Sequence, residues 1–177
     1  MNVIGIAGFS GSGKTTLVER LIPLMRAAGK RVSVVKHAHH SFNIDHEGKD
    51  TWRHRAAGAF EVVVASNTRL ALMREFEQEA ALTVHQVIAE LYDGVDWVIV
   101  EGFKNSDIHK LEVWRASENN SARYVHDPFI AAVATDSPEL LPQATQLPVL
   151  DLNNPQAVVN WILANALRFE YNAEMFA

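Results

Sequence analysis

A glycine-rich stretch near the N-terminus, GFSGSGKT at residues 8–15, constrains the fold more than any other part of the sequence. It matches the pattern G-x-x-x-x-G-K-[ST], and it follows an apolar run at residues 3–7 and precedes an amphipathic segment. Gly11 and Gly13 allow a tight turn that points successive backbone N–H groups at phosphate oxygens. The N-terminus of the following helix adds partial positive charge. The sequence therefore predicts a strand, a phosphate-binding loop and a helix in that order.

The side chains of this loop have distinct expected roles. Lys14 is expected to reach the β- and γ-phosphates of a nucleotide, and the Thr15 hydroxyl to face Mg²⁺. The residues that we expect to bind the phosphates or their metal ion are Gly8, Ser10, Gly11, Ser12, Gly13, Lys14, Thr15 and Thr16.

Composition narrows the class of protein. The 177 residues are 48% hydrophobic, which fits one globular domain, and we expect this domain at 1–167 with a tail at 168–177. A net charge of −5 argues against a nucleic-acid partner. No cysteine is present, and no apolar run approaches the roughly 20 residues that span a bilayer. We therefore expect a cytoplasmic protein without a membrane partner.

Strand and helix patterns alternate along the chain. Helices are expected after the loop, at 51–57, after Thr83 and after the Asn154–Pro155 pair, which provides an N-cap and a proline at the first helical position. Residues 111–116 and 123–125 are interpreted as an inserted β-ribbon. Other strands are expected at 3–7, 31–36, 60–65, 70–74, 97–102, 130–134 and 149–152. The fold class is therefore α/β, a three-layer P-loop NTPase fold with a mainly parallel sheet.

Ligands of such sheets lie at the carboxyl ends of the strands, where this sequence has acidic and cationic side chains. Glu101 ends an apolar run and is the expected catalytic carboxylate that holds Mg²⁺ or orients water. Asp45 is a second candidate catalytic carboxylate, although a turn aspartate is an equal interpretation. Residues that we expect to contact an anionic ligand are Lys36, His39, His40, Arg53 and Lys104.

Nucleotide choice depends on residues 133–136, VATD, which retain only the carboxylate of the Asn-Lys-x-Asp guanine signature. Asp136 could accept the N–H groups of guanine, with poorer discrimination against adenine. Two other functions remain open at this point. A small-molecule kinase would use Arg53 and Arg55 with Asp45 as the base, and a GTP-driven metallochaperone would use the histidines between His37 and His46.

Three stretches together resemble one family. Residues 36–45 (KHAHHSFNID), residues 48–59 (GKDTWRHRAAGA) and residues 100–104 (VEGFK) are similar, in this order, to the MobB proteins of molybdopterin guanine dinucleotide biosynthesis. The likeness extends over residues 3–167. It implies a dimeric cytoplasmic protein that binds GTP with Mg²⁺, hydrolyses it slowly, and assists the MobA-type transferase that joins GMP to molybdopterin.

The resemblance also implies that residues 8–15 bind phosphates and that Glu101 lies near Mg²⁺. Dimerisation is expected at the ribbon of residues 111–125. The residues themselves suggest a further hypothesis, in which Lys36, Arg53 and Lys104, with His39 and His40, form a second anion site for the phosphate of molybdopterin.

Overall fold

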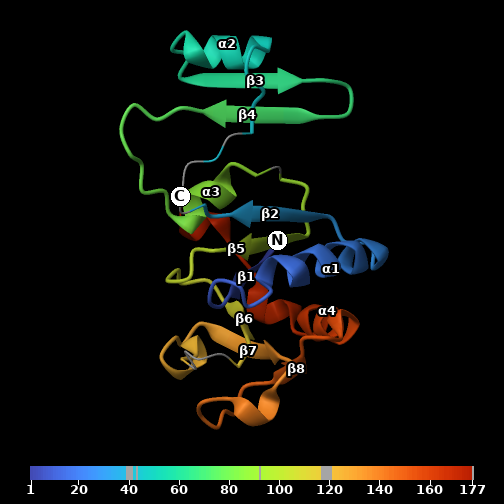
Figure 1. Cartoon of the computed structure of the whole chain (residues 1–177). Helices are drawn as coiled ribbons and strands as arrows, with labels where there is room; N and C mark the ends of the chain where they lie inside the picture. Colours follow the sequence, from blue (N-terminus) through green and yellow to red (C-terminus); the bar gives the residue numbers. More distant parts are fainter. Residues whose placement is uncertain (39–41, 43, 92, 117–120, 177) are drawn as a thin grey trace. The chain divides into compact units, whose positions relative to one another are not determined.

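The structure is a computed structural model that describes residues 1–38, 42, 44–91, 93–116 and 121–176 (Figure 1). Contacts within the chain divide it into two compact units. The first unit comprises Met1–His37 and Thr83–Ala177, and the second comprises Ala38–Leu82. The expected single domain at 1–167 with a tail at 168–177 stays a prediction.

The first unit contains a parallel sheet of six strands in the order β2-β5-β1-β6-β7-β8. The strands are β1 (Asn2–Ala7), β2 (Val32–Lys36), β5 (Trp97–Glu101), β6 (Lys110–Trp114), β7 (Ile130–Thr135) and β8 (Val149–Asp151). The helices are α1 (Lys14–Ala27), α3 (Val84–Ala89) and α4 (Pro155–Ala164), with the 3₁₀ turns η1 (Arg123–Val125), η2 (Pro138–Leu140), η3 (Ala166–Phe169) and η4 (Ala173–Met175). The expected mainly parallel α/β sheet is therefore confirmed.

Helices cover both faces of this sheet because its central strands are apolar on both faces. On one face, Leu21 and Met25 of α1 and Ile162 of α4 pack against strand residues such as Ile4 and Ile99. On the other face, α3 packs against β2 and β5, while the segment around η1 covers β7. The alternation of side chains along each strand thus divides one sheet between separate cores.

Two of the predicted helix starts, at Thr83 and at the Asn154–Pro155 pair, are confirmed by their caps. The Thr83 side chain accepts from the backbone N–H of Gln86, and the Gln86 side chain accepts from the Thr83 N–H, which completes a capping box. Asn154 accepts from the Ala157 N–H and precedes the proline that begins α4.

The prediction of a ribbon at residues 111–125 is wrong. Residues Lys110–Trp114 form β6, which pairs parallel with β1 and β7 inside the sheet, and Arg123–Val125 is a 3₁₀ turn. All five residues of β6 are buried, including Lys110 and Glu112. These two charges made a central strand resemble the polar alternation of an exposed one. Within the described residues 110–116 and 121–125, no exposed ribbon is present to form a dimer interface.

The residues after α4 pack in the first unit. The Phe169 side chain is 2% exposed and contacts the rings of Trp97 and Trp161. Glu170 then forms an antiparallel bridge with Asn2, and the Tyr171 N–H donates to the Met1 carbonyl at 2.9 Å. The apolar character of this segment is thus explained by packing beside the start of β1.

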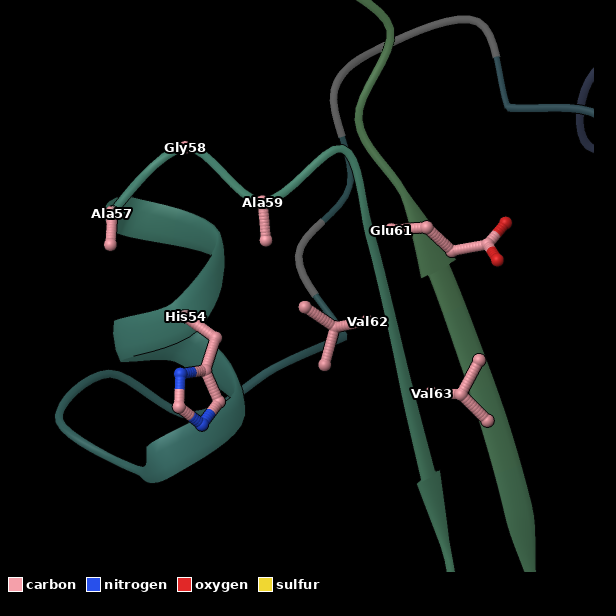
Figure 2. A pocket seen from close by; sticks show the side chains of 7 residues that line it. All are labelled: His54, Ala57, Gly58, Ala59, Glu61, Val62 and Val63. Atoms are coloured by element: carbon pink, nitrogen blue, oxygen red, sulfur yellow. The ribbon is translucent and has the colours of Figure 1, made fainter.

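The second unit contains α2 (Asp50–Ala56) and an antiparallel hairpin of β3 (Glu61–Ala65) and β4 (Leu70–Arg74). The two strands match the expected ones closely. In Figure 2, Val62 points from β3 toward α2, whereas Glu61 and Val63 point to the opposite side of the hairpin. Val62 is accordingly the buried residue of β3.

The sharp turn after β5 depends on a glycine at position 102. Its φ is +98°, and a Cβ at this position would lie 2.7 Å from the Cβ of His37. We expect Gly102→Ala to lower the free energy of unfolding by about 1–2 kcal/mol from the left-handed backbone alone. Overpacking against His37 should add about 1–3 kcal/mol. Urea unfolding followed by circular dichroism measures the change.

Gly29→Ala is the matched control, because Gly29 has a φ of +76° and no atom within 4 Å of its added Cβ. We expect only the backbone cost there. Equal losses in the two variants would contradict the close packing of Gly102 on His37.

Candidate functional site

The P-loop of residues 8–15 joins β1 to α1 in the expected conformation. Gly8, Gly11 and Gly13 all have positive φ, and the Gly13 position immediately before α1 is left-handed. Residues 14–17, the first turn of α1, contain no Asp or Glu, so the positive end of the helix dipole is not neutralised from within the turn. The loop therefore offers backbone N–H groups and positive potential to an anion.

Lys14 lies across this loop. Its Nζ donates to the Gly8 carbonyl at 3.0 Å and to the Phe9 carbonyl at 2.6 Å. Burial lowers the pKa of Lys14, while the nearby Glu101 raises it and Lys36 lowers it. A bound phosphate would supply negative charge to this partly desolvated ammonium group.

The end of β5 meets the P-loop at a charged contact. The Thr15 hydroxyl donates to Oε1 of Glu101 at 2.7 Å, although 86 residues separate the two in sequence. Lys36 of β2 donates its Nζ to the same oxygen. The Glu101 residue is only 5% exposed, so these donors compensate a buried carboxylate.

Sheet register explains why these three residues meet. Glu101 is paired with Lys36 on β2 and with Ile6 on β1, just before the P-loop. Three parallel strands thus end side by side, as expected of a ligand site in this kind of sheet. The chain then turns sharply at Gly102 and at Phe103, which has a φ of +45°.

The pair of Thr15 and Glu101 fits Mg²⁺. A hydroxyl and a carboxylate are hard oxygen ligands, and Mg²⁺ in nucleotide sites is held by few protein oxygens together with phosphates. The buried Oγ of Ser12 has no hydrogen-bond partner among the described residues, so the loop also retains a polar atom for a ligand or water. The residues present are therefore compatible with a magnesium–phosphate group.

Arg115 is a site residue that the sequence analysis missed. Its Nε donates to the Ser12 carbonyl of the P-loop at 3.0 Å, and its Nη1 pairs with Oδ2 of Asp136. A Cβ on Gly13 would lie 3.6 Å from the same Nε. The only available signal was its position directly after β6, which had been interpreted as a ribbon.

Asp136 follows β7 and is 23% exposed in its side chain. Its Oδ2 is bound by Arg115, and its Oδ1 accepts from the Ser137 hydroxyl at 3.0 Å. A guanine edge would therefore compete with, or join, a carboxylate that already has partners. Arg115 connects this carboxylate to the phosphate loop.

The remaining predicted anion contacts belong to different units of the chain. Lys104 is exposed in the loop after β5, and its carbonyl accepts from Arg123 at 2.9 Å. Arg53 belongs to the second unit, where Nη1 lies 3.8 Å from Asp50. His39 and His40 lie outside the described residues. The hypothesis of one second anion site that includes all of these residues stays a prediction.

Asp45 also belongs to the second unit and organises its loop. It accepts from the Thr51 hydroxyl at 2.9 Å, from the His46 N–H at 2.9 Å and from Arg55 at 3.2 Å. Burial raises the pKa of Asp45, but these hydrogen bonds outweigh it and hold the pKa below its ordinary value. The contacts favour the interpretation of a turn aspartate, and a catalytic role stays a prediction.

The second unit also has an open hollow of about 520 Å³ between the end of α2 and β3 (Figure 2). Small residues, Ala57, Gly58 and Ala59, form one side, and His54 and Val62 contribute larger side chains. No chemistry was predicted for this hollow.

Within the described ranges, no three His, Asp or Glu side chains gather as a metal site. The metallochaperone hypothesis includes His39 and His40, which these ranges omit. Among the helices of the described chain, none is long and apolar enough to cross a bilayer.

Comparisons with known proteins agree with this geometry. Residues 3–136 match the family model "MobB: Molybdopterin guanine dinucleotide synthesis protein B". A molybdopterin-guanine dinucleotide biosynthesis adapter protein of Haemophilus influenzae is 39% identical, over 90% of this chain and 89% of the relative. The adapter protein of Escherichia coli is 37% identical, over 91% of each chain.

A solved structure has the same fold. The crystal structure of a MobB protein homolog from Bacillus stearothermophilus has a TM-score of 0.71, is 27% identical, and covers 94% of this chain and 99% of its own. The match of the family model to most of the chain, together with relatives of this identity, shows that the chain belongs to the MobB family.

Proposed function

We propose that this protein binds GTP with Mg²⁺ at the P-loop, hydrolyses it slowly, and acts in the cytoplasm as an adapter to a MobA-type guanylyltransferase that attaches GMP to molybdopterin. The observation that carries the nucleotide part is the contact of Thr15 with Glu101 beside Lys14. It combines the phosphate, metal and carboxylate elements of a P-loop nucleotide site within one compact unit.

The adapter part is supported by family membership and by the printed names of the relatives. GTP rather than ATP is supported by Asp136. Its carboxylate is bound by Arg115 and Ser137 but has further lone pairs, which can accept the N1–H and N2–H groups of guanine that adenine lacks. The small-molecule kinase is less favoured, because Asp45 is engaged by Thr51 and Arg55.

Lys14→Ala tests nucleotide binding. Hydrogen bonds to charged groups contribute about 1.5–3 kcal/mol, so we expect a loss of GTP affinity of roughly 10- to 150-fold. Isothermal titration with GTP and ATP, each with Mg²⁺, measures this loss and the preference for guanine. Lys30→Ala is the matched control, since Lys30 is exposed after α1. Equal affinities for GTP and ATP would contradict the GTP assignment.

Glu101→Gln tests the metal role. We expect Mg²⁺ to raise the affinity of the wild-type protein for GTP. In the variant, the ratio of the GTP affinities with and without Mg²⁺ should be smaller by about tenfold or more, because one charge-assisted contact contributes about 1.5–3 kcal/mol. Titrations with Mg²⁺ and with EDTA measure it. Glu19→Gln, on the exposed side of α1, is the control. An unchanged effect of Mg²⁺ in Glu101→Gln would exclude this carboxylate as part of the metal site.

We further propose that the protein forms a homodimer through the hairpin of the second unit. On the face opposite α2, Val63 and Leu72 pair across the strands, and Leu70 pairs with Ala65. The side chains of Val63, Leu70 and Leu72 are 54%, 67% and 45% exposed. A two-stranded sheet is marginally stable alone, so a second copy of this apolar face is a fitting cover.

Leu72→Glu tests the dimer. Each leucine buried in the interface contributes roughly 1.5–3 kcal/mol to the free energy of association. In a dimer with twofold symmetry, each substitution is present twice in the interface. We therefore expect the variant to be monomeric at concentrations where the wild type is dimeric, as measured by light scattering after size exclusion. Thr68→Glu adds the same charge in the turn of the hairpin and should leave the dimer intact. A dimer that survives Leu72→Glu would place the interface elsewhere.

A further inference from the structure

A pocket of about 500 Å³ borders the P-loop within the first unit. Phe9 of the P-loop lines it together with Asn105 and Ser106, which follow β5, and with residues of the segment 121–129 between β6 and β7. The proposed phosphate and magnesium contacts do not use these side chains. The volume lies within the range of about 300–1,000 Å³ that is typical of small-molecule sites.

One wall of the pocket is held by Lys110 of β6. This side chain is 1% exposed, and its Nζ donates to the Ser106 carbonyl at 2.6 Å and pairs with Asp127 at 3.2 Å. The ammonium group also lies 5.1 Å from the centre of the Phe129 ring. Burial lowers the pKa of Lys110, and the Asp127 carboxylate raises it. One buried cation thus connects both loops that line the pocket.

Glu112, two residues along the same strand, holds another part of the wall. It is fully buried, and its two carboxylate oxygens accept from the N–H groups of Arg123 and Tyr124, each at 2.7 Å. Burial raises the pKa of Glu112, and these hydrogen bonds oppose the rise. The carboxylate therefore fixes the start of η1 on the sheet.

Two buried charges on a central strand need an explanation, because apolar side chains of similar volume would stabilise a sheet at least as well. Lys110 and Glu112 both direct their polar atoms at the loops around the pocket, and not at each other. Buried groups that orient the walls of a site are typical of preorganised ligand binding. The strand thus serves as a rigid base for the pocket.

The side chains that line the pocket favour a ligand with a planar ring and a negative charge. Phe9, Pro128 and Phe129 provide apolar surface, on which a planar ring can stack. Arg123 adds positive charge, and its guanidinium is positioned by the Lys104 carbonyl at 2.9 Å and by Asn105 at 2.7 Å.

Two polar atoms of the lining remain unused. The buried Nε of Arg123 and the buried Oγ of Ser106 have no hydrogen-bond partner within the described part of the chain. Such atoms are rare in folded proteins, and a ligand or a water molecule would satisfy them.

We propose that this pocket binds a planar, hydrogen-bonding heterocycle with an anionic substituent, of the pterin class, next to the P-loop. The assignment of the pterin class rests on the proposed function. It would bring a pterin phosphate close to a nucleotide at the P-loop, because Phe9 belongs to both the loop and the pocket.

Pterin-6-carboxylate is a suitable probe, because its own fluorescence reports binding to the full-length protein. We expect saturable binding to the wild type and at least tenfold weaker binding to Ser121→Trp, which fills the pocket from a residue that lines it. Should Ser121→Trp fail to fold, His126→Trp blocks the pocket from another exposed lining position. Gln146→Trp, exposed and not part of the lining, is the matched control and should bind normally.

Three results would overturn the inference: no probe binding by the wild type, full binding by the folded tryptophan variants, or equal binding of 2-naphthoate, which lacks the heterocyclic hydrogen-bonding edge. GTP titration of the same samples separates the two proposals. Intact GTP binding without pterin binding refutes the pocket alone, whereas pterin binding without GTP binding refutes the nucleotide site and leaves the pocket.

Discussion

The hydrogen bond from Thr15 to Glu101, with Lys36 on the same oxygen, is the interaction on which the site depends. A carboxylate that is 5% exposed requires donors, and they come from the start of α1 and from the end of β2. These elements meet only because β2, β5 and β1 are adjacent parallel strands that end at the same edge. Because buried Glu101 needs these donors, the strand order of the sheet and the position of the P-loop depend on each other.

A second electrostatic constraint acts on the other side of β1. Lys110 and Glu112 bury opposite charges in β6, and each is compensated by loop atoms, not by a neighbouring strand. Burying a charged group costs desolvation free energy, which is offset only when its hydrogen-bond partners are in place. These two side chains therefore favour the loop positions that supply their partners. Arg115, at the end of the same strand, then connects the Ser12 carbonyl with Asp136. One central strand thus positions a pocket wall, the P-loop and the carboxylate proposed for guanine.

Much of the fold could be predicted from local patterns. The apolar runs of β1 and β5, the helix start at Thr83 and the Asn154–Pro155 start of α4 depend on residues close in sequence, and all were confirmed. The resemblance to the MobB family, based on residues 36–45, 48–59 and 100–104, was also confirmed. The strand β6 was misinterpreted because a buried Lys and Glu resemble solvent-exposed residues when their partners, such as Asp127 and the Arg123 N–H, are unknown.

The sequence by itself determined that a glycine-rich loop with the P-loop pattern joins the first strand to a helix, since the conformation of the loop is set by glycines within a few residues of one another. Only the tertiary structure decided that Glu101 faces Thr15, that Arg115 reaches the P-loop and that Asp45 is held by Thr51 and Arg55. The physical reason is that a sequence shows which side chains carry charge. The groups that compensate this charge depend on strand order and on loop contacts between distant residues, such as Arg115 and Ser12, which are 103 residues apart.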